Sequence, residues 1–126
     1  MNGRTVLLLI TGLLLVPVVG VIAASPDELY NMGVSLQYQG RYAEAVGLFD
    51  QVVAAEPEFA AAWCYRGKAL AGLERYDEAL ESLDKALEIK PDYSLAWSSK
   101  ADILLGMKRF AEAAWARSEV AALGQL

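Results

Sequence analysis

Downstream of residue 25 the chain carries apolar residues at intervals of three and four, the spacing that places them on one face of an α-helix. Leu29, Met32 and Leu36 form the first such series, and nothing in the region alternates with the period of a β-strand. The series breaks and restarts, which predicts several short helices. The first begins at Ser25-Pro26 and ends before Gln39-Gly40-Arg41, and the others cover residues 42–55, 59–72, 76–89, 92–106 and 110–123.

Residues that favour helix ends lie between these series. Ser25-Pro26-Asp27-Glu28 combines a capping serine, a proline suited to the first turn, acidic residues at the positive end of the dipole and a capping box between Ser25 and Glu28. Gly40 follows the first helix as its C′ residue. Later helices end at Glu56-Pro57 and Lys90-Pro91, because a residue before proline avoids the helical conformation.

A short sequence returns every 34 residues. Gly40-Arg41-Tyr42-Ala43-Glu44-Ala45 is followed by Glu74-Arg75-Tyr76-Asp77-Glu78-Ala79 and by Lys108-Arg109-Phe110-Ala111-Glu112-Ala113. A fixed period of this length indicates a stack of units that cannot bury their apolar faces alone. The six helices therefore form three antiparallel pairs, joined by the short connections expected between neighbouring helices. The predicted fold class is an all-α solenoid.

Small residues stand at matching points of each helix pair. Gly33, Gly67 and Ala101 occupy the first helices, and Ala45, Ala79 and Ala113 occupy the second helices. Small side chains at a helix crossing let the two backbones approach closely. A larger residue at Gly67 or Ala79 is expected to overpack the junction, at a cost of about 1–3 kcal/mol.

The N-terminal segment differs from the rest of the chain. Arg4 precedes an uncharged stretch from Val6 to Ala24 that ends in small residues. This is typical of a cleaved signal peptide, and its length also suits an uncleaved membrane anchor that begins the fold with a hydrophobic helix. Both interpretations divide the chain into residues 1–24 and a domain at 25–126. Because the basic Arg4 is expected to remain on the cytoplasmic side of the membrane, both interpretations place that domain on the extracytoplasmic side. The domain is then secreted, periplasmic or anchored to the outer face of the membrane.

The composition argues against several classes of function. The formal net charge is −5, which disfavours a nucleic-acid partner. The chain has no histidine and one cysteine, Cys64, so it lacks the commonest general base, the commonest metal ligand and any internal disulfide. No nucleophile with a neighbouring base can be assembled from the remaining residues. We therefore expect no catalytic site, metal or cofactor, and a protein that binds other proteins.

The repeated pattern resembles the tetratricopeptide repeat. Trp63-Cys64-Tyr65-Arg66-Gly67-Lys68-Ala69-Leu70 matches the opening of that motif, apart from Arg66 and Leu70. Its second half is matched by Ala45-Val46-Gly47-Leu48-Phe49 with Pro57, and by Ala79, Leu83 and Pro91. The resemblance covers everything after the N-terminal segment, with repeats at about 26–59, 60–93 and 94–126.

The resemblance implies a right-handed superhelix whose first helices line a concave groove for a peptide or a helix of a partner. Carried over by position, the groove candidates are Tyr30, Asn31, Val34, Gln37 and Tyr38, then Cys64, Tyr65, Lys68 and Ala71, then Leu95, Ser98, Ser99, Asp102 and Leu105. Chaperone-binding members hold a C-terminal carboxylate with basic and amide side chains at positions that are here Tyr30, Val34, Tyr65, Leu95 and Ser99. Since no such clamp is present, we expect the groove to prefer an apolar or aromatic segment.

Three residues carry open alternatives. Arg117 replaces Phe49 and Leu83 in the last repeat, and we expect it to face water. Trp115 either packs under the C-terminal tail or marks a contact with another chain. Cys64 is either a small buried hydrophobe or a reactive thiol near Lys68. The alternative function is therefore a self-associating module, a homodimer through Trp115 and the Ala-rich last helix.

Overall fold

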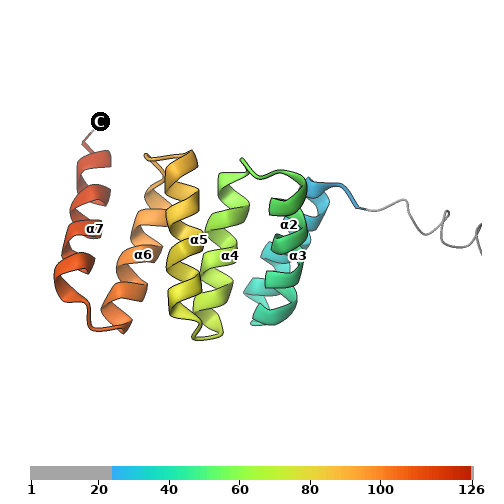
Figure 1. Cartoon of the computed structure of the whole chain (residues 1–126), viewed down its shortest axis with the longest axis horizontal. Helices are drawn as coiled ribbons and strands as arrows, with labels where there is room; N and C mark the ends of the chain where they lie inside the picture. The colour runs from blue at the N-terminus through green and yellow to red at the C-terminus, as the bar shows by residue number, and fades with distance from the viewer. Residues whose placement is uncertain (1–23, 126) are drawn as a thin grey trace, which may run out of the picture.

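The computed structural model describes residues 24–125, which fold into six α-helices and contain no β-strand. The helices are α2 (Pro26–Tyr38), α3 (Tyr42–Ala55), α4 (Ala60–Gly72), α5 (Tyr76–Ile89), α6 (Ser94–Gly106) and α7 (Phe110–Leu123). They stack in chain order along the long axis of the molecule (Figure 1). The predicted all-α solenoid is therefore confirmed over this range.

The predicted N-terminal hydrophobic helix falls within residues 1–23, outside the described part of the chain. In residues 24–125, no helix combines the length and the apolar character that crossing a membrane requires.

The helix bounds follow the predicted ones closely. α3, α5 and α7 begin and end where the sequence predicts, whereas α4 and α6 begin slightly later than expected, after Phe59 and Tyr93. The backbone N–H of Phe59 donates to the carbonyl of Glu56 at 3.1 Å, and that of Tyr93 donates to Lys90 at 3.2 Å. These bonds close turns around the prolines, and Phe59 and Tyr93 have non-helical ψ values of 84° and 89°.

The start of α2 contains the predicted capping box. The hydroxyl of Ser25 accepts a hydrogen bond from the backbone N–H of Glu28 at 3.2 Å, and the carboxylate of Glu28 accepts one from the backbone N–H of Ser25 at 2.7 Å. Two N–H groups that the helix leaves unpaired are thereby satisfied.

The first helix of every repeat ends in the same left-handed turn. Gly40 has a φ of 75°, and its counterparts Glu74 and Lys108 both have a φ of 60°. In each case the backbone N–H of the following residue donates to a carbonyl in the last turn of the helix. The N–H of Arg41, for example, donates to the carbonyl of Leu36 at 2.9 Å. This bond pattern is a Schellman motif, for which glycine is the preferred residue. The predicted C′ role of Gly40 is confirmed, and two non-glycine residues perform the same role at the later turns.

Small residues bring the two helices of a repeat together. A Cβ placed on Gly67 would lie 2.8 Å from Cγ of Leu83 and 3.0 Å from the carbonyl oxygen of Ala79. A Cβ on Gly33 would lie 2.8 Å from the ring of Phe49. The close approach predicted at Gly33 and Gly67 is therefore present. The buried core around these points comprises Ala45, Val46, Phe49, Val52, Ala62, Cys64, Ala69, Leu70, Ala79, Leu80, Leu83, Ala86, Leu87, Ala96, Ala101, Ile103, Leu104, Ala113 and Ala116.

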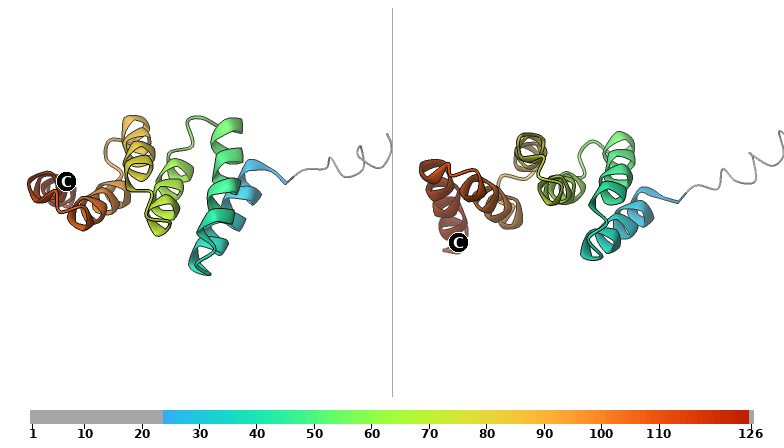
Figure 2. Two further views of the ribbon diagram at one scale, coloured as in Figure 1. Left: turned by 60° about the horizontal axis from the view of Figure 1, so that its bottom comes forward. Right: turned by 90° about the horizontal axis from the view of Figure 1, so that it is seen from below.

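The stack is curved, with the first helix of each pair on the inside. α2 contacts α4 and α4 contacts α6, whereas α3, α5 and α7 make no contacts with one another. The views in Figure 2 show the pairs fanning around this inner side. The surface formed by α2, α4 and α6 is called the inner groove below.

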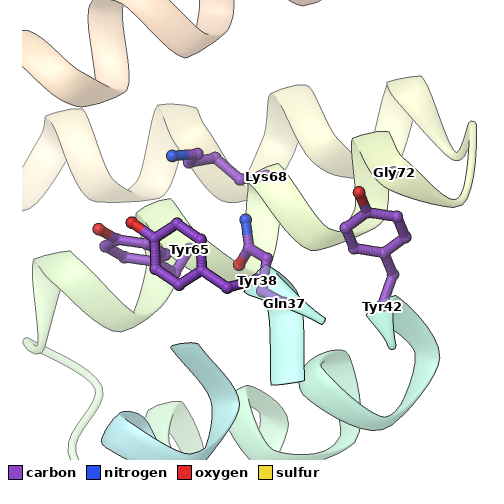
Figure 3. Close-up of a pocket in the computed structure, with 6 residues that line it drawn as sticks. All are labelled: Gln37, Tyr38, Tyr42, Tyr65, Lys68 and Gly72. Carbon is purple, nitrogen blue, oxygen red and sulfur yellow. The ribbon is translucent and has the colours of Figure 1, made fainter. Parts of the chain in front are cut away.

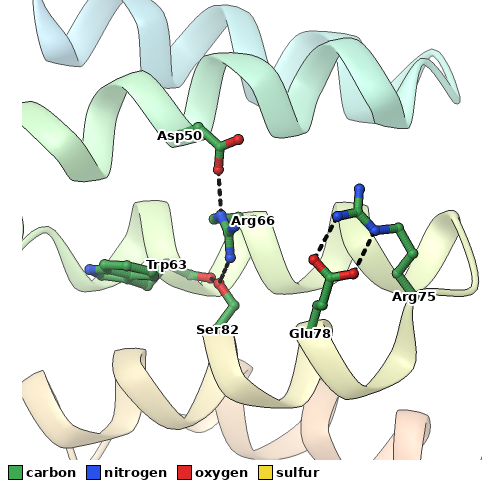
Figure 4. Close-up of polar contacts among 6 residues, drawn as sticks. All are labelled: Asp50, Trp63, Arg66, Arg75, Glu78 and Ser82. Carbon is green, nitrogen blue, oxygen red and sulfur yellow. Dashed lines mark hydrogen bonds and ion pairs between the residues drawn. The ribbon is translucent and has the colours of Figure 1, made fainter.

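Adjacent repeats are joined by an ion pair that recurs. Arg66 of α4 donates to Asp50 of α3 at 2.6 Å, and Lys100 of α6 donates to Asp84 of α5 at 2.5 Å. Arg66 also donates to the hydroxyl of Ser82, at 3.5 Å (Figure 4). Ser82 in turn donates to the carbonyl of Trp63 at 2.8 Å. A buried hydroxyl is thereby satisfied between α4 and α5.

The last repeat has an uncovered end face that carries both charged and apolar side chains. Arg117 is exposed at the position where Phe49 and Leu83 are fully buried, as predicted. Phe110 at the start of α7 is 63% exposed, because no further helix covers it in the described structure.

Candidate functional site: the inner groove

An aromatic cluster forms the floor of the inner groove at the first junction. The ring of Tyr30 lies 4.9 Å from Phe59 and 5.8 Å from Tyr65, edge to face in the second case, with Phe49 at 6.1 Å. Burial raises the pKa of Tyr30 to about 12. Tyr30, a predicted groove residue, is thus mainly a packing residue that joins the first two repeats.

A pocket of about 470 Å³ opens between α2 and α4. Its lining comprises Gln37, Tyr38, Tyr42, Tyr65, Lys68 and Gly72 (Figure 3). Tyr38 is 79% exposed, which leaves most of its ring free for contact. Tyrosine is an effective contact residue because it combines an apolar ring with a hydroxyl at modest entropic cost. Burial raises the pKa of Tyr65, and the adjacent Tyr38 hydroxyl adds to this effect, so the phenol is neutral at physiological pH.

Lys68 is the cation of this pocket. Its ammonium lies 4.9 Å from the centroid of the Tyr65 ring, a cation–π distance. The ion pairs within residues 24–125 are all formed by other side chains, so no carboxylate in that range neutralises it. A partly buried ammonium without an anion is a favourable site for a negatively charged ligand group.

Gln37 contributes an unused acceptor. Its amide oxygen is buried, and no hydrogen-bond donor in the described residues reaches it. A buried acceptor without a donor costs roughly 1–3 kcal/mol.

A second, smaller hollow of about 180 Å³ lies between α4 and α6. Lys68 borders it as well, together with Ala71, Ser99, Asp102 and Ile103. Lys68 therefore stands between the pocket and the hollow, and the two form consecutive parts of the inner groove.

The structure corrects one groove candidate. Cys64 is fully buried, and burial raises the pKa of its thiol to about 11, against a smaller lowering by Lys68 and Tyr93. The alternative of a small buried hydrophobe is therefore the correct one. Position on the motif predicts a groove-facing side chain here, but Cys64 lies beneath the surface beside Tyr93.

The other candidates divide into two sets. Gln37, Tyr38, Tyr65, Lys68, Ala71, Ser99 and Asp102 line the pocket or the hollow. Val34, Leu95 and Leu105 pack against the core, Ser98 donates to the carbonyl of Leu95, and exposed Asn31 lines neither cavity.

Two residues that line the pocket, Tyr42 and Gly72, are absent from the predicted set of groove residues. Tyr42 belongs to α3, a second helix, and its ring would contact a Cβ on Gly72 at 2.7 Å. Tyr42 therefore reaches across to the end of α4 and closes one side of the pocket (Figure 3). The sequence signal for this contact is Gly72, whose missing side chain leaves room for the ring of Tyr42 from the preceding repeat.

Trp115 matches neither of its two predicted alternatives, packing under the C-terminal tail or marking a contact with another chain, completely. Its ring stands edge to face against Trp97 at 5.1 Å, and the ammonium of Lys100 lies 5.7 Å from it. It remains 52% exposed. Trp115 therefore packs on α6, outside the groove, and keeps half of its surface free.

Comparison with known proteins agrees with this architecture. A family model described as tetratricopeptide repeat matches residues 30–94. No curated protein matches the sequence. Among solved structures, the second TPR of Spaghetti (RPAP3), bound to the HSP90 peptide SRMEEVD, gives a TM-score of 0.74 at 20% identity, covering 78% of this chain and 91% of that chain.

Two further structures are similar. The TPR2B domain of yeast Sti1, in complex with pHsp70, gives a TM-score of 0.76 at 24% identity and covers 78% of each chain. The Sgt2 TPR domain from Aspergillus fumigatus gives 0.76 at 21% identity, covering 82% of this chain and 68% of that chain. At these identities the likeness shows a shared fold.

Proposed function

Because the chain belongs to the tetratricopeptide repeat family, we propose that it is a protein-interaction scaffold that binds a segment of a partner protein in the inner groove. The observation that carries this proposal is the pocket between α2 and α4. It combines a tyrosine that is 79% exposed with a lysine that forms no ion pair within residues 24–125. A bound segment can contact an exposed ring and a lysine of this kind without breaking an internal interaction of the fold.

The structural neighbours support this use of the groove. The structures of Spaghetti and Sti1 contain an HSP90 peptide and pHsp70, respectively. The present groove has different chemistry, because Tyr30, Val34 and Tyr65 occupy positions where a carboxylate clamp needs cations or amides. The proposed ligand is therefore a segment with apolar or aromatic residues, rather than a chain terminus held by several cations.

We place this scaffold on the extracytoplasmic side. The support is the sequence of residues 1–24, which carries Arg4 before an uncharged stretch. A cleaved signal releases the solenoid, and an uncleaved one tethers it to the membrane. Mass spectrometry of the mature N-terminus distinguishes the two, since a start at Ala24 or Ser25 indicates release and an intact Met1 indicates tethering.

The proposed function is tested with a random peptide library displayed on phage and the full chain in neutral detergent micelles. We expect selected sequences to share a pattern and to lose binding to Tyr38→Ala, which removes an exposed ring at little cost in stability. The matched control is Trp115→Ala, which removes a half-exposed aromatic outside the groove. Equal loss in both variants, or no selection above an empty-micelle background, would contradict the proposal.

A second candidate function is homodimerisation through α7. Phe110, Ala114 and Arg117 are exposed there, while their counterparts in the earlier repeats are covered by the next helix. Sedimentation equilibrium at a density that matches the detergent tests it. A dimer that dissociates in Phe110→Glu supports self-association through this face, and a monomer at every concentration rules it out.

A further inference from the structure

We propose that the pocket between α2 and α4 receives an acidic side chain of the bound segment, and that the hollow between α4 and α6 receives a small apolar side chain beside it. This inference rests on the proposed function, since it specifies the chemistry of the segment that the inner groove binds.

The acidic preference follows from Lys68. It is the only cation among the residues that line the pocket and the hollow. Its ammonium is held over the ring of Tyr65 at 4.9 Å and meets no carboxylate within residues 24–125. A carboxylate brought to this ammonium forms a charge-assisted hydrogen bond, which is about twice as strong as a neutral one.

The other polar groups of the pocket complete a site for a carboxylate within a peptide. The hydroxyls of Tyr38 and Tyr65 lie beside each other in the pocket (Figure 3), and the ammonium of Lys68 lies over the Tyr65 ring at 4.9 Å. A tyrosine hydroxyl can donate a hydrogen bond to the second carboxylate oxygen.

The neighbouring hollow has a different lining. Ala71 and Ile103 are apolar, and the hollow measures about 180 Å³ against about 470 Å³ for the pocket. It therefore suits a small apolar side chain, with Ser99 and Asp102 at its border. Because Lys68 borders both cavities, the acidic and the apolar residue of the segment lie close together in sequence.

The acidic residue is internal to the segment. The groove continues from Lys68 in both directions, towards Tyr38 on α2 and towards Asp102 on α6. A single lysine also lacks the several donors that a chain terminus requires, and the net charge of −5 disfavours a strongly acidic ligand. One carboxylate with uncharged neighbours satisfies both conditions.

The test compares peptides selected on the full chain in neutral detergent micelles with those selected on Lys68→Glu. The probe is the random phage-displayed peptide library. We expect the wild type to enrich Asp or Glu at one position beside Ala, Val or Leu, and Lys68→Glu to enrich Lys or Arg there instead. Lys108→Glu is the matched control, because it makes the same charge change at a turn where the preceding repeat has Glu74 with the same φ of 60°.

A synthetic selected peptide gives the magnitude. Replacing its acidic residue by the corresponding amide is expected to weaken binding to the wild type about tenfold, and to change binding to Lys68→Glu little or in the opposite direction. Selected peptides without an acidic preference, but dependent on Tyr38, would overturn this inference and leave the proposed function intact. No selection on the wild type would overturn both.

Discussion

Arg66 of α4 binds Asp50 of α3 across the first inter-repeat junction, with Nε and Oδ1 2.6 Å apart. The same relationship recurs 34 residues later between Lys100 and Asp84, at 2.5 Å. In both pairs the cation is largely covered, with 22% and 18% of the side chain exposed, and the acid is about half exposed. The aliphatic part of the cationic side chain therefore lies along the junction between repeats, and the carboxylate of the preceding repeat holds its charged end in place.

We expect the two members of the first pair to contribute unequally. Asp50→Ala loses a half-exposed ion pair and should lower the free energy of unfolding by about 0.5–1 kcal/mol. Arg66→Ala should cost more, about 1–3 kcal/mol, because it also removes packing over Trp63, 5.8 Å from the guanidinium, and the bond to Ser82. Urea unfolding followed by circular dichroism measures both values. In the double variant the two effects should differ from additivity by about 0.5 kcal/mol or more, and simple addition would show that the pair contributes nothing.

Two glycines in helix interiors should respond to alanine in opposite directions. At Gly67 the added methyl meets the backbone oxygen of Ala79, which cannot move freely, so Gly67→Ala should destabilise the fold by about 1–2 kcal/mol despite its better helix propensity. At Gly47 a Cβ meets nothing within 4 Å, so Gly47→Ala should stabilise the fold by up to about 1 kcal/mol. The same urea titration compares the two. Equal effects would show that propensity, rather than the close helix approach, decides both positions.

The left-handed turns predict a stabilising substitution. Glu74 and Lys108 hold a φ of 60°, a conformation that costs an L-residue roughly 1–2 kcal/mol. Glu74→Gly removes this strain and loses part of the gain to the greater freedom of the unfolded chain, so a net stabilisation of about 0.5–1 kcal/mol is expected. Gly40→Ala is the reciprocal change and should destabilise by a similar amount. A loss of stability in Glu74→Gly would mean that the Glu74 side chain makes a stabilising interaction of its own.

Burial of Cys64 predicts a loss of stability at alkaline pH. Burial raises the pKa of its thiol from its ordinary value of 9.0 to about 11, so the unfolded chain releases this proton before the folded chain does. The contribution is fully present below pH 9 and is lost between about pH 9 and 11, with a slope approaching about 1.4 kcal/mol per pH unit. Urea unfolding across this range measures the slope. Cys64→Ala should flatten it, and an unchanged slope would assign the loss to other groups, such as Tyr30.

The sequence was sufficient for the helices because local signals agree with the fold at each boundary. Ser25 and Glu28 form a capping box from residues three apart, and the prolines at 57 and 91 end helices without tertiary help. The spacing of 34 residues then fixes which helices pair. These signals are short-range or strictly periodic, so one sequence is enough to reveal them.

The groove was less accessible to sequence reasoning, because it depends on which side chain covers which. Cys64 occupies a motif position that faces the groove, yet it is buried beside Tyr93. Tyr42 belongs to a second helix but closes the pocket, because the glycine at position 72 gives its ring room. Trp115 contacts Trp97, a pairing between nonequivalent positions that no period encodes. Contacts of this kind are set by side-chain size and rotamer, not by register.

The ladder of ion pairs is interrupted at both ends of the solenoid. Met32, 52% exposed, occupies the position of Arg66 and Lys100, and Ser118 occupies the position of Asp50 and Asp84. An engineer who wished to lengthen the molecule with a fourth module would therefore begin with Ser118→Asp and a module whose first helix carries a lysine at the matching place. Growth of the array would also require an apolar residue in place of Arg117, because Phe49 and Leu83 are buried at the matching positions of the earlier repeats.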